Sequence, residues 1–361
     1  MTTLQLRNHI PIAGPARREA ADGSESPLRV SLGFEPAWFH TRCGVEFDGR
    51  WHTDPIYRHD SLVACKRELK RAFPAIDYWD TLSDGDLWTL SGVYGAYVVA
   101  RLFGAELLYG VDRWPTPPRP MFTLDKLNQF TVDQLLSNEL VADLNRQMDV
   151  IERESGRIHG YLNWQGVLNN AFILIGQDIF TEMVERPALV HRVFDFISDL
   201  IIRFATLIQS RQTASGFIVD HLSVSNCTIN MLSPKFYREF VFPYDQKIAE
   251  HFTRFGVHTC NWNATPYLKE LVHLPNVGYI DMGIETNLAQ AKTLFSEARR
   301  AVMYSPVKLQ DATRAEIEND LRKIYNELAP CDIVMADIQA TTPDARVNEF
   351  VEIGRIVSGS N

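Results

Sequence analysis

Long apolar runs are absent from this sequence of 361 residues, although 45% of its residues are hydrophobic. A membrane-spanning helix needs about 20 consecutive, mainly apolar residues, and a secretory signal needs an apolar segment near the N-terminus. Neither pattern occurs, and the N-terminal stretch MTTLQLRNHIPIAGPARREAADGS is polar. We therefore expect a cytoplasmic protein with no membrane span and with enough hydrophobic residues for a large core.

Cysteines are also few, and basic residues are outnumbered by acidic ones. The five cysteines are odd in number, form no C-x-x-C pair and are scattered along the chain: Cys43, Cys65, Cys227, Cys260 and Cys331. This usage argues against a disulfide framework and predicts thiols that are free or metal-bound. The formal net charge is −9 and there is no basic stripe, so nucleic-acid binding is not expected.

Short apolar runs alternate with longer amphipathic stretches over most of the chain. Eight runs are candidate strands: 28–34, 104–110, 157–164, 215–222, 255–262, 277–283, 300–307 and 331–338. The alternation predicts β/α units around a parallel sheet. Because the runs are mostly continuous, as in strands covered on both faces, they favour an α/β fold of the (β/α)8 TIM-barrel type. A doubly wound sheet is the alternative.

The chain divides into an arm and one barrel domain. Residues 1–27 contain Gly, Ser and Pro without lasting periodicity, which predicts a loose N-terminal arm. We expect residues 28–361 to form a single TIM-barrel domain. Within it, about 45–150 is longer than one β/α unit needs, and we interpret this segment as a helical elaboration that partly covers the barrel mouth.

The stretch FGVHTCNWN (255–263) places a histidine and a cysteine two positions apart at the end of a predicted strand. Side chains two apart in a strand project to the same face, so His258 and Cys260 can share one ion. Imidazole and thiolate are ligands that zinc prefers, but a catalytic zinc takes three protein ligands. The pair alone also fits a buried cysteine beside a hydrogen-bonded histidine.

A third ligand has to come from another strand end. Asp337 is our candidate, because it lies near the carboxyl end of the last predicted strand. Cys331, Asp281 and Glu285 are the alternatives. Cys331 begins its strand, which would place it at the floor of the barrel.

Polar residues follow two further predicted strands. Asp220 ends the run GFIVD, and its carboxylate can act as a general base or orient a substrate, with His221 beside it as a substrate-binding candidate. A helix or turn cap is the alternative role for Asp220. Asn163 and Gln165, after the third run, are either polar substrate-binding groups or plain loop residues.

The stretch RWHTDPIYRHD (50–60) gathers histidines, acids and arginines beside aromatic residues. Clusters of this composition are mostly solvated surface or turn chemistry. We give it little functional weight.

Two longer motifs carry a resemblance to a known family. The block VDHLSVSNCTINMLSPKFYREFVFPYDQKI is similar to a central Asp followed by S-P-x-x-[FY]-x-x-[FY]-x-x-P, and GVHTCNWN resembles an H-x-C-G-N stretch. These motifs resemble the uroporphyrinogen decarboxylase superfamily over most of 95–355, and within it the methylcobamide-dependent methyltransferases. The resemblance implies that Asp220 is the central carboxylate and that His258 and Cys260 are zinc ligands.

The chain departs from that family at three places. The third zinc ligand of those methyltransferases is a cysteine near the end of the last strand, where this chain has Ala336 and Asp337. Asn261 stands where the pattern has Gly, and we consider it a substrate-binding candidate. Of the R-Q-A-G-R signature of the decarboxylases, only Arg42 survives as a cation that could bind a substrate.

The resemblance implies a methyltransferase that passes a methyl group between a corrinoid (cobalamin), presented by a corrinoid-binding partner protein, and a small donor or acceptor. A thiol, a folate or a methoxylated compound would fit, with zinc as the cofactor. The alternatives are a tetrapyrrole decarboxylase and a non-catalytic barrel that binds a corrinoid or a partner. A decarboxylase needs several Arg or Lys for the acidic side chains of its substrate, and the lost arginine signature and the net charge of −9 argue against it. A homodimer is compatible with the sequence, which does not define the oligomeric state.

Overall fold

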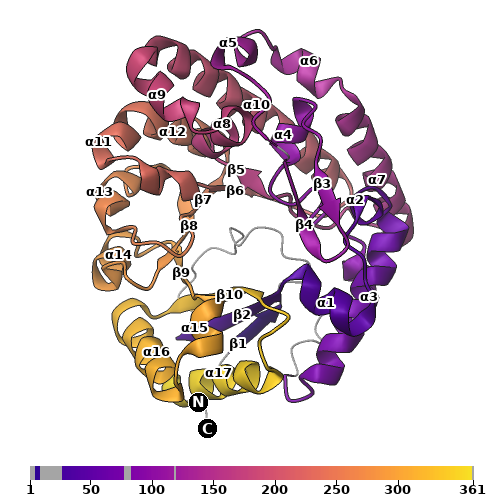
Figure 1. The fold of residues 1–361 in the computed structure, drawn as a ribbon, viewed down its shortest axis with the longest axis vertical. Coiled ribbons are helices and arrows are strands. Elements are labelled where there is room, and N and C mark those ends of the chain that lie inside the picture. The colour runs from indigo at the N-terminus through magenta and orange to yellow at the C-terminus, as the bar shows by residue number, and fades with distance from the viewer. Residues whose placement is uncertain (1–4, 9–26, 77–82, 118, 360–361) are drawn as a thin grey trace.

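The computed structural model describes residues 5–8, 27–76, 83–117 and 119–359 of the chain. An eight-stranded sheet has the order β1-β2-β10-β9-β8-β7-β6-β5, and every pair of neighbouring strands is parallel. Helices surround the strands (Figure 1). The strands are β1 (Gln5–Asn8), β2 (Leu28–Phe34), β5 (Trp164–Gln165), β6 (His221–Ser225), β7 (Arg254–His258), β8 (Val277–Gly283), β9 (Arg299–Met303) and β10 (Cys331–Ile338). The fold is that of a TIM barrel, as predicted.

Burial explains why strands such as β2 (LRVSLGF) are mainly apolar, although β6 (HLSVS) and β9 (RRAVM) also carry buried polar residues. All residues of β2, β6 and β9 are buried. A strand in a parallel sheet is covered by helices on one face and by the barrel interior on the other, so neither face selects for polar residues along its length. Polar residues are therefore informative where a strand ends.

The outer helices follow the strands in the chain. They are α1 (Pro36–Cys43), α8 (Val167–Ile175), α9 (Asp178–Glu185), α10 (Pro187–Ala214), α11 (Pro234–Phe236), α12 (Phe242–His251), α13 (Leu268–Leu271), α14 (Leu288–Leu294), α15 (Pro306–Asp311), α16 (Arg314–Leu328) and α17 (Asp344–Val357). Three single turns accompany them: η3 (Cys227–Met231), η4 (Tyr237–Val241) and η5 (Thr265–Tyr267).

Helix α16 shows how local sequence makes these helices. A capping box starts it, because the Thr313 hydroxyl accepts from the Glu316 N–H while the Glu316 carboxylate accepts from the Thr313 N–H. Its buried residues recur at helical spacing: Ile317, Leu321, Ile324 and Leu328. They form the apolar face that packs between α14 and α17.

Three predicted strands differ from the structure. Of the run 157–164 only Trp164 lies in a strand, because β5 comprises Trp164–Gln165 alone. The run 104–110 does not join the barrel, because β3 (Leu108–Gly110) turns back on β4 (Arg113–Thr116) as an antiparallel pair. Thr89 instead forms an isolated parallel bridge with His159, outside the strands of the sheet. The run 215–222 is also misplaced, since β6 begins only at His221.

The insertion predicted at about 45–150 is mainly helical. It comprises α2 (Gly49–Thr53), α3 (Pro55–Ala72), η2 (Asp84–Leu87), α4 (Val98–Leu102), α5 (Leu124–Leu127), α6 (Val132–Leu136) and α7 (Glu139–Ser155), with the β3–β4 hairpin between α4 and α5. These elements lie along one side of the barrel in Figure 1.

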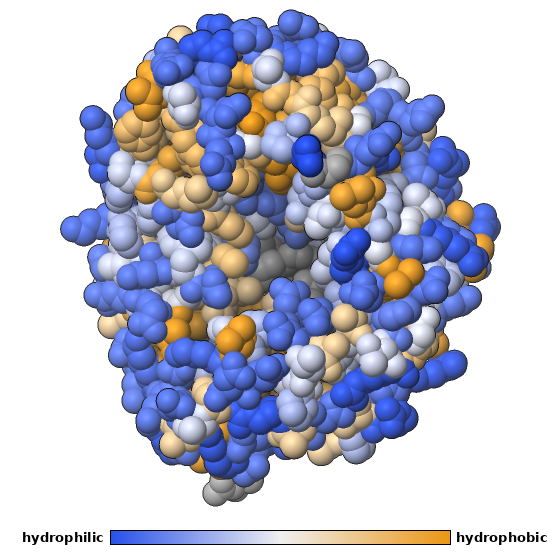
Figure 2. Space-filling view, viewed as in Figure 1, coloured by the Kyte–Doolittle hydropathy of each residue, from blue (hydrophilic) through white to orange (hydrophobic). Residues whose placement is uncertain are grey.

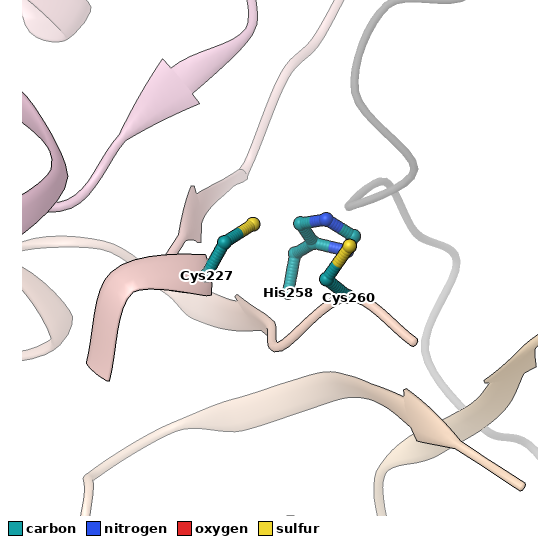
Figure 3. A group of neighbouring side chains, drawn as sticks. All are labelled: Cys227, His258 and Cys260. Carbon is teal, nitrogen blue, oxygen red and sulfur yellow. The ribbon is translucent and has the colours of Figure 1, made fainter. Parts of the chain in front are cut away.

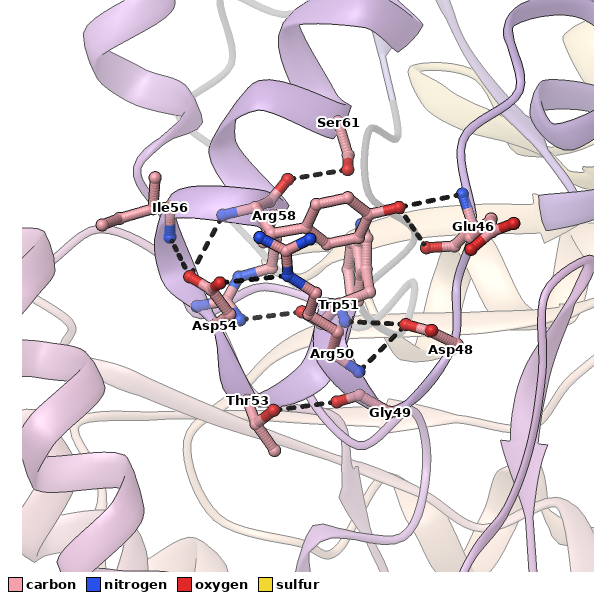
Figure 4. Close-up of polar contacts among 11 residues, drawn as sticks. Glu46, Asp48, Gly49, Arg50, Trp51, Thr53, Asp54, Ile56, Arg58 and Ser61 are labelled. Atoms are coloured by element: carbon pink, nitrogen blue, oxygen red, sulfur yellow. Dashed lines mark hydrogen bonds and ion pairs between the residues drawn. The ribbon is translucent and has the colours of Figure 1, made fainter.

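The polar stretch 50–60 stabilises this insertion (Figure 4). The Asp48 and Asp54 carboxylates accept backbone N–H groups at the starts of α2 and α3, respectively. The fully buried Arg58 donates from Nε to the Thr89 carbonyl and from Nη1 to the Trp51 carbonyl. The cluster is therefore structural. It is not solvated surface throughout, as predicted, because Trp51, His52 and Arg58 are buried.

A single hydrophobic cluster includes buried residues from Leu28 to Val357. Residues 5–8 of the predicted loose arm form β1, which pairs with β2, and the rest of that arm up to residue 26 lies outside the described residues. Among the described helices, none combines the length and the apolar character that crossing a bilayer requires. The space-filling view shows a hollow near the centre of the face in view, with hydrophilic residues over much of the surrounding surface (Figure 2).

Candidate metal centre

The carboxyl ends of β6 and β7 bring together a histidine and two cysteines. In the sheet register Ser225, the last residue of β6, is paired with His258, the last residue of β7. Cys227 and Cys260 each lie two residues beyond these paired positions. The parallel register therefore places both thiols at the same level, beside the imidazole.

Among the described residues, Cys227, His258 and Cys260 form a group whose geometry could hold a metal ion (Figure 3). One ligand atom from each residue lies within 4.8 Å of the others. Ligand atoms around a tetrahedral zinc lie about 3.5–4 Å apart, given Zn–S of about 2.3 Å and Zn–N of about 2.0–2.1 Å. Two thiolates and an imidazole are a known catalytic zinc set with a fourth position left open. The donor set and its spacing thus fit zinc.

Asp281 orients the imidazole of His258. The His258 Nδ1 lies 2.7 Å from Oδ2 of Asp281, whose side chain is completely buried. The same carboxylate accepts from the Thr259 N–H at 2.9 Å and the Tyr279 hydroxyl at 3.0 Å. With Nδ1 engaged, Nε2 is the nitrogen left for a metal, an arrangement typical of zinc-binding histidines. Asp281, one of the alternative third ligands, is instead a support of His258.

The electrostatics of the centre favour a thiolate. A hydrogen bond with Cys227 lowers the pKa of Cys260 to about 4, against the effect of burial and with further help from His258. The same hydrogen bond and burial raise the pKa of Cys227 well above its usual range. Burial is the largest single effect on His258 and lowers its pKa, but the charges of Asp281 and Cys227 and the hydrogen bonds to both together raise the pKa well above its usual value. Deprotonated sulfur is the form that binds a metal.

One carboxylate, that of Asp337, lies near the centre without joining it. Asp337 has φ +58 and lies within a shift of the β10 register between Met335 and Ile338, so the strand no longer alternates regularly there. The residue is exposed to solvent on one side. Protein atoms packed around its carboxyl group, together with the negative charges of Glu35 and Cys260, raise its pKa. Glu35, at the end of β2, accepts the Ala340 N–H at 2.8 Å. Asp337 is not a member of the three-residue group.

Asn163 and Gln165 belong to the neighbouring strand end. Gln165 Nε2 donates to Asn163 Oδ1 at 3.1 Å, and Gln165 Oε1 accepts from Asn169 at 2.8 Å. Asn169 Oδ1 in turn accepts the Thr228 N–H at 3.0 Å, directly after Cys227. These amides therefore border the centre and support the turn that carries one of its thiols. Asn261 is exposed directly after Cys260.

The family model described as uroporphyrinogen decarboxylase (URO-D) matches residues 91–355, which include all three members of the group. The chain belongs to the uroporphyrinogen decarboxylase family. No curated protein matches it significantly.

A solved structure shares the fold of this family member, and a second one is more distantly similar. A methyltransferase from Methanosarcina mazei is 16% identical with a TM-score of 0.61, and the match covers 90% of this chain and 93% of that one. A B12-independent methionine synthase from Shewanella sp. W3-18-1, in complex with selenomethionine, is 13% identical with a TM-score of 0.43, covering 93% of this chain and 98% of that one.

Asp220 does not lie at the carboxyl end of its strand in this family member. It precedes β6, and its carbonyl accepts the N–H of Arg254, the first residue of β7. Five residues of strand, or about 16 Å, separate that level from Ser225. The carboxylate pairs with Arg254 at 2.5 Å and lies 3.5 Å from His221. The strand-end placement of Asp220 and His221 was therefore wrong, and their position does not support the catalytic and substrate-binding roles predicted for them.

Arg42, the one cation expected from the decarboxylase signature, is paired with an acidic side chain. Arg42 makes two hydrogen bonds to Asp344, of 2.8 and 2.5 Å, and its guanidinium lies 4.1 Å from the Trp38 ring centroid. Its charge is thus neutralised within the fold. Cys331 is buried at the start of β10, as predicted for a floor residue, and Glu285 is an exposed loop residue.

Cys227 is the residue that sequence analysis missed. The cause is the misplaced strand: a run ending at Leu222 leaves Cys227 deep in the following loop. The signal was present in HLSVSNC, where Leu222 and Val224 alternate with serines as in a strand that ends just before the cysteine.

Proposed function

We propose that this chain is a methyltransferase that moves a methyl group between a corrinoid, carried by a partner protein, and a small donor or acceptor, at a zinc held by Cys227, His258 and Cys260. The observation that carries the proposal is the convergence of two sulfurs and one imidazole nitrogen at neighbouring strand ends. Cys227 replaces Asp337 as our third ligand, because thiolate binds zinc more tightly than carboxylate.

The donor set favours a thiol as the methyl acceptor. A bound zinc would hold a thiol substrate as the thiolate at neutral pH, which is the nucleophilic form. Both cysteines are only partly buried, so a substrate can reach the centre. A folate or a methoxylated compound is the alternative substrate class.

The residues around the centre have separate parts in this proposal. Asp281 keeps the Nδ1 side of His258 occupied, which directs Nε2 to the metal. Asn163 and Gln165 offer amide groups that can orient the substrate. Asp337 lies beside Cys260, and its raised pKa makes its carboxylate a better acceptor for the thiol proton than a free aspartate.

Metal analysis and a methyl-transfer assay test the proposal together. We expect the purified protein to contain about one zinc per chain and to demethylate methylcobalamin in the presence of a small thiol. Cys227→Ser, His258→Ala and Cys260→Ser should each lose most of the metal and the activity. Asp337→Ala should keep the metal, and it serves as the matched control for a neighbouring side chain outside the donor set.

Two outcomes would contradict the proposal. The proposed zinc centre would be contradicted if the wild-type protein contained no zinc, or if the Cys227→Ser variant contained as much zinc as the wild type is expected to bind. Decarboxylation of a tetrapyrrole without any methyl transfer would favour the decarboxylase alternative, although Arg42 is paired with Asp344.

A further inference from the structure

Asn226 links the two strand ends that carry the metal-binding group. It lies directly before Cys227, and its backbone N–H donates to the carbonyl of His258 at 2.8 Å. Its side chain is completely buried and donates from Nδ2 to Oδ2 of Asp245 on α12, also at 2.8 Å. One residue therefore connects the segment of Cys227 to His258 on one side and to an outer helix on the other.

Asp245 is an unusual residue for the inside of a helix layer. Its side chain is completely buried, and no ion pair to it is found among the described residues, so its desolvation is offset by hydrogen bonds alone. Burial raises its pKa to about 7, despite the hydrogen bonds from Tyr237 and Asn226. An apolar residue at this place would cost less, which indicates that the carboxyl is kept for the bonds that it accepts.

Two further contacts fix the hydrogen-bonded pair of Asn226 and Asp245. The Tyr237 hydroxyl donates to the same Oδ2 atom at 3.0 Å, and Tyr237 begins the π-helical turn η4 just before α12. Such turns are rare and frequently mark functional sites. On the opposite side a Cβ at Gly166 would lie 1.9 Å from Asn226 Oδ1, so only glycine leaves room for the amide.

We propose that Asn226 and Asp245 are positioning residues that hold the Cys227 thiol at coordinating distance from His258 and Cys260. The proposal rests on the metal centre proposed above. Neither residue offers a ligand atom to the group. Their contribution is to fix the turn after β6, so that the third donor is in place before a metal arrives.

Zinc affinity and the spectrum of cobalt-substituted protein test this role. Loss of an outer-shell support typically lowers metal affinity by about 10- to 100-fold, and we expect that loss for Asn226→Ala in a chelator competition. In the Co²⁺ form the sulfur-to-cobalt charge-transfer band should weaken toward that of Cys227→Ser, because one thiolate is no longer held. A merely structural role would leave this band unchanged.

Further variants keep the test independent of folding. Asp245→Leu removes the acceptor but fills its volume, so it should fold and should show the same loss of affinity. Asp245→Asn retains an acceptor oxygen and should restore much of the affinity. Tyr237→Phe removes the other bond to Oδ2 without touching Asn226, and it should lower stability while the affinity and the cobalt spectrum stay at wild-type values.

Wild-type affinity and an unchanged cobalt spectrum in both Asn226→Ala and Asp245→Leu would overturn the inference. So would equal losses in Tyr237→Phe, since they would indicate a general effect on packing. If the wild-type protein binds zinc but transfers no methyl group, the proposed function fails while this inference stands. If the wild type binds no zinc, both fail.

Discussion

At the scale of single residues, the centre depends on how each donor is supported. Asp281 forms a hydrogen bond with His258, and we propose that Asn226, held by Asp245, positions Cys227. Cys260 is positioned by its own backbone, which adopts φ +66. A positive φ is strained for a residue other than glycine, and strained residues that persist are commonly found at functional sites.

Asp281→Asn should weaken the metal centre without unfolding the protein. The substitution removes the negative charge that stabilises the Nδ1–H form of His258, so zinc affinity should fall by about 10- to 100-fold. Chelator competition measures the change. Asp320→Asn is a matched control, because Asp320 also accepts a tyrosine hydroxyl, that of Tyr304. Equal affinity in both variants would argue against a supporting role for Asp281.

Asp245 should also make the stability of the metal-free protein depend on pH. Its folded pKa of about 7 lies above the usual value of 3.8. Between these values the folded state binds more protons than the unfolded state, so this group lowers stability as pH rises, by up to about 1.4 kcal/mol per pH unit. Asp245→Asn should remove that slope. Denaturant unfolding of the wild type and of Asp245→Asn at pH 5 and pH 7 measures the two slopes. Parallel pH profiles of the two proteins would contradict this prediction, because they would show that Asp245 is ionised in the folded state throughout this range.

At the scale of elements, the register between β6 and β7 decides which residues meet. Because Ser225 is opposite His258, the turns after both strands lie side by side, and each carries a cysteine at its second position. The start of α8 closes this arrangement, since the Gly166 N–H donates to the Ser225 carbonyl at 2.9 Å.

Gly166→Ala tests that close approach. The added methyl would collide with Asn226, and overpacking of this kind costs about 1–3 kcal/mol. We expect lower thermal stability together with weaker zinc binding, because the displaced residue adjoins Cys227. In Gly85→Ala the nearest contact would be an ordinary 3.5 Å from Ser83 Oγ, so that variant should change neither property. Wild-type zinc affinity in Gly166→Ala would contradict this prediction, because it would show that the packing of α8 against Asn226 does not affect the metal centre.

At the scale of the whole molecule, the barrel fold was predicted from the sequence, but not all of its strands were located correctly. Continuous apolar runs such as 28–34 and 331–338 were located correctly, because a buried parallel strand leaves a strong signal. The run 104–110 was wrong, since an antiparallel hairpin in the insertion has the same local composition as a barrel strand.

The site was predicted only where local periodicity is sufficient. His258 and Cys260 were paired by assuming alternation within one strand. The structure does bring them together, but β7 ends at His258 and Cys260 lies in the turn beyond it with φ +66. Cys227 and Asp281 come from other strands, so their proximity depends on the register between strands, which no single segment contains. Asp337 was selected for its place near a strand end, and the bend in β10 at that point is not visible in its composition.

X-ray absorption at the zinc edge of the wild-type protein tests the central claim most directly. The account predicts two sulfur neighbours at about 2.3 Å and one imidazole nitrogen at about 2.0 Å, with a lighter atom completing the tetrahedron. The Cys227→Ser variant should retain a single sulfur if it binds zinc at all. A wild-type spectrum with one sulfur and two or more oxygen neighbours would instead favour Asp337 as the third ligand and contradict the centre described for Cys227, His258 and Cys260.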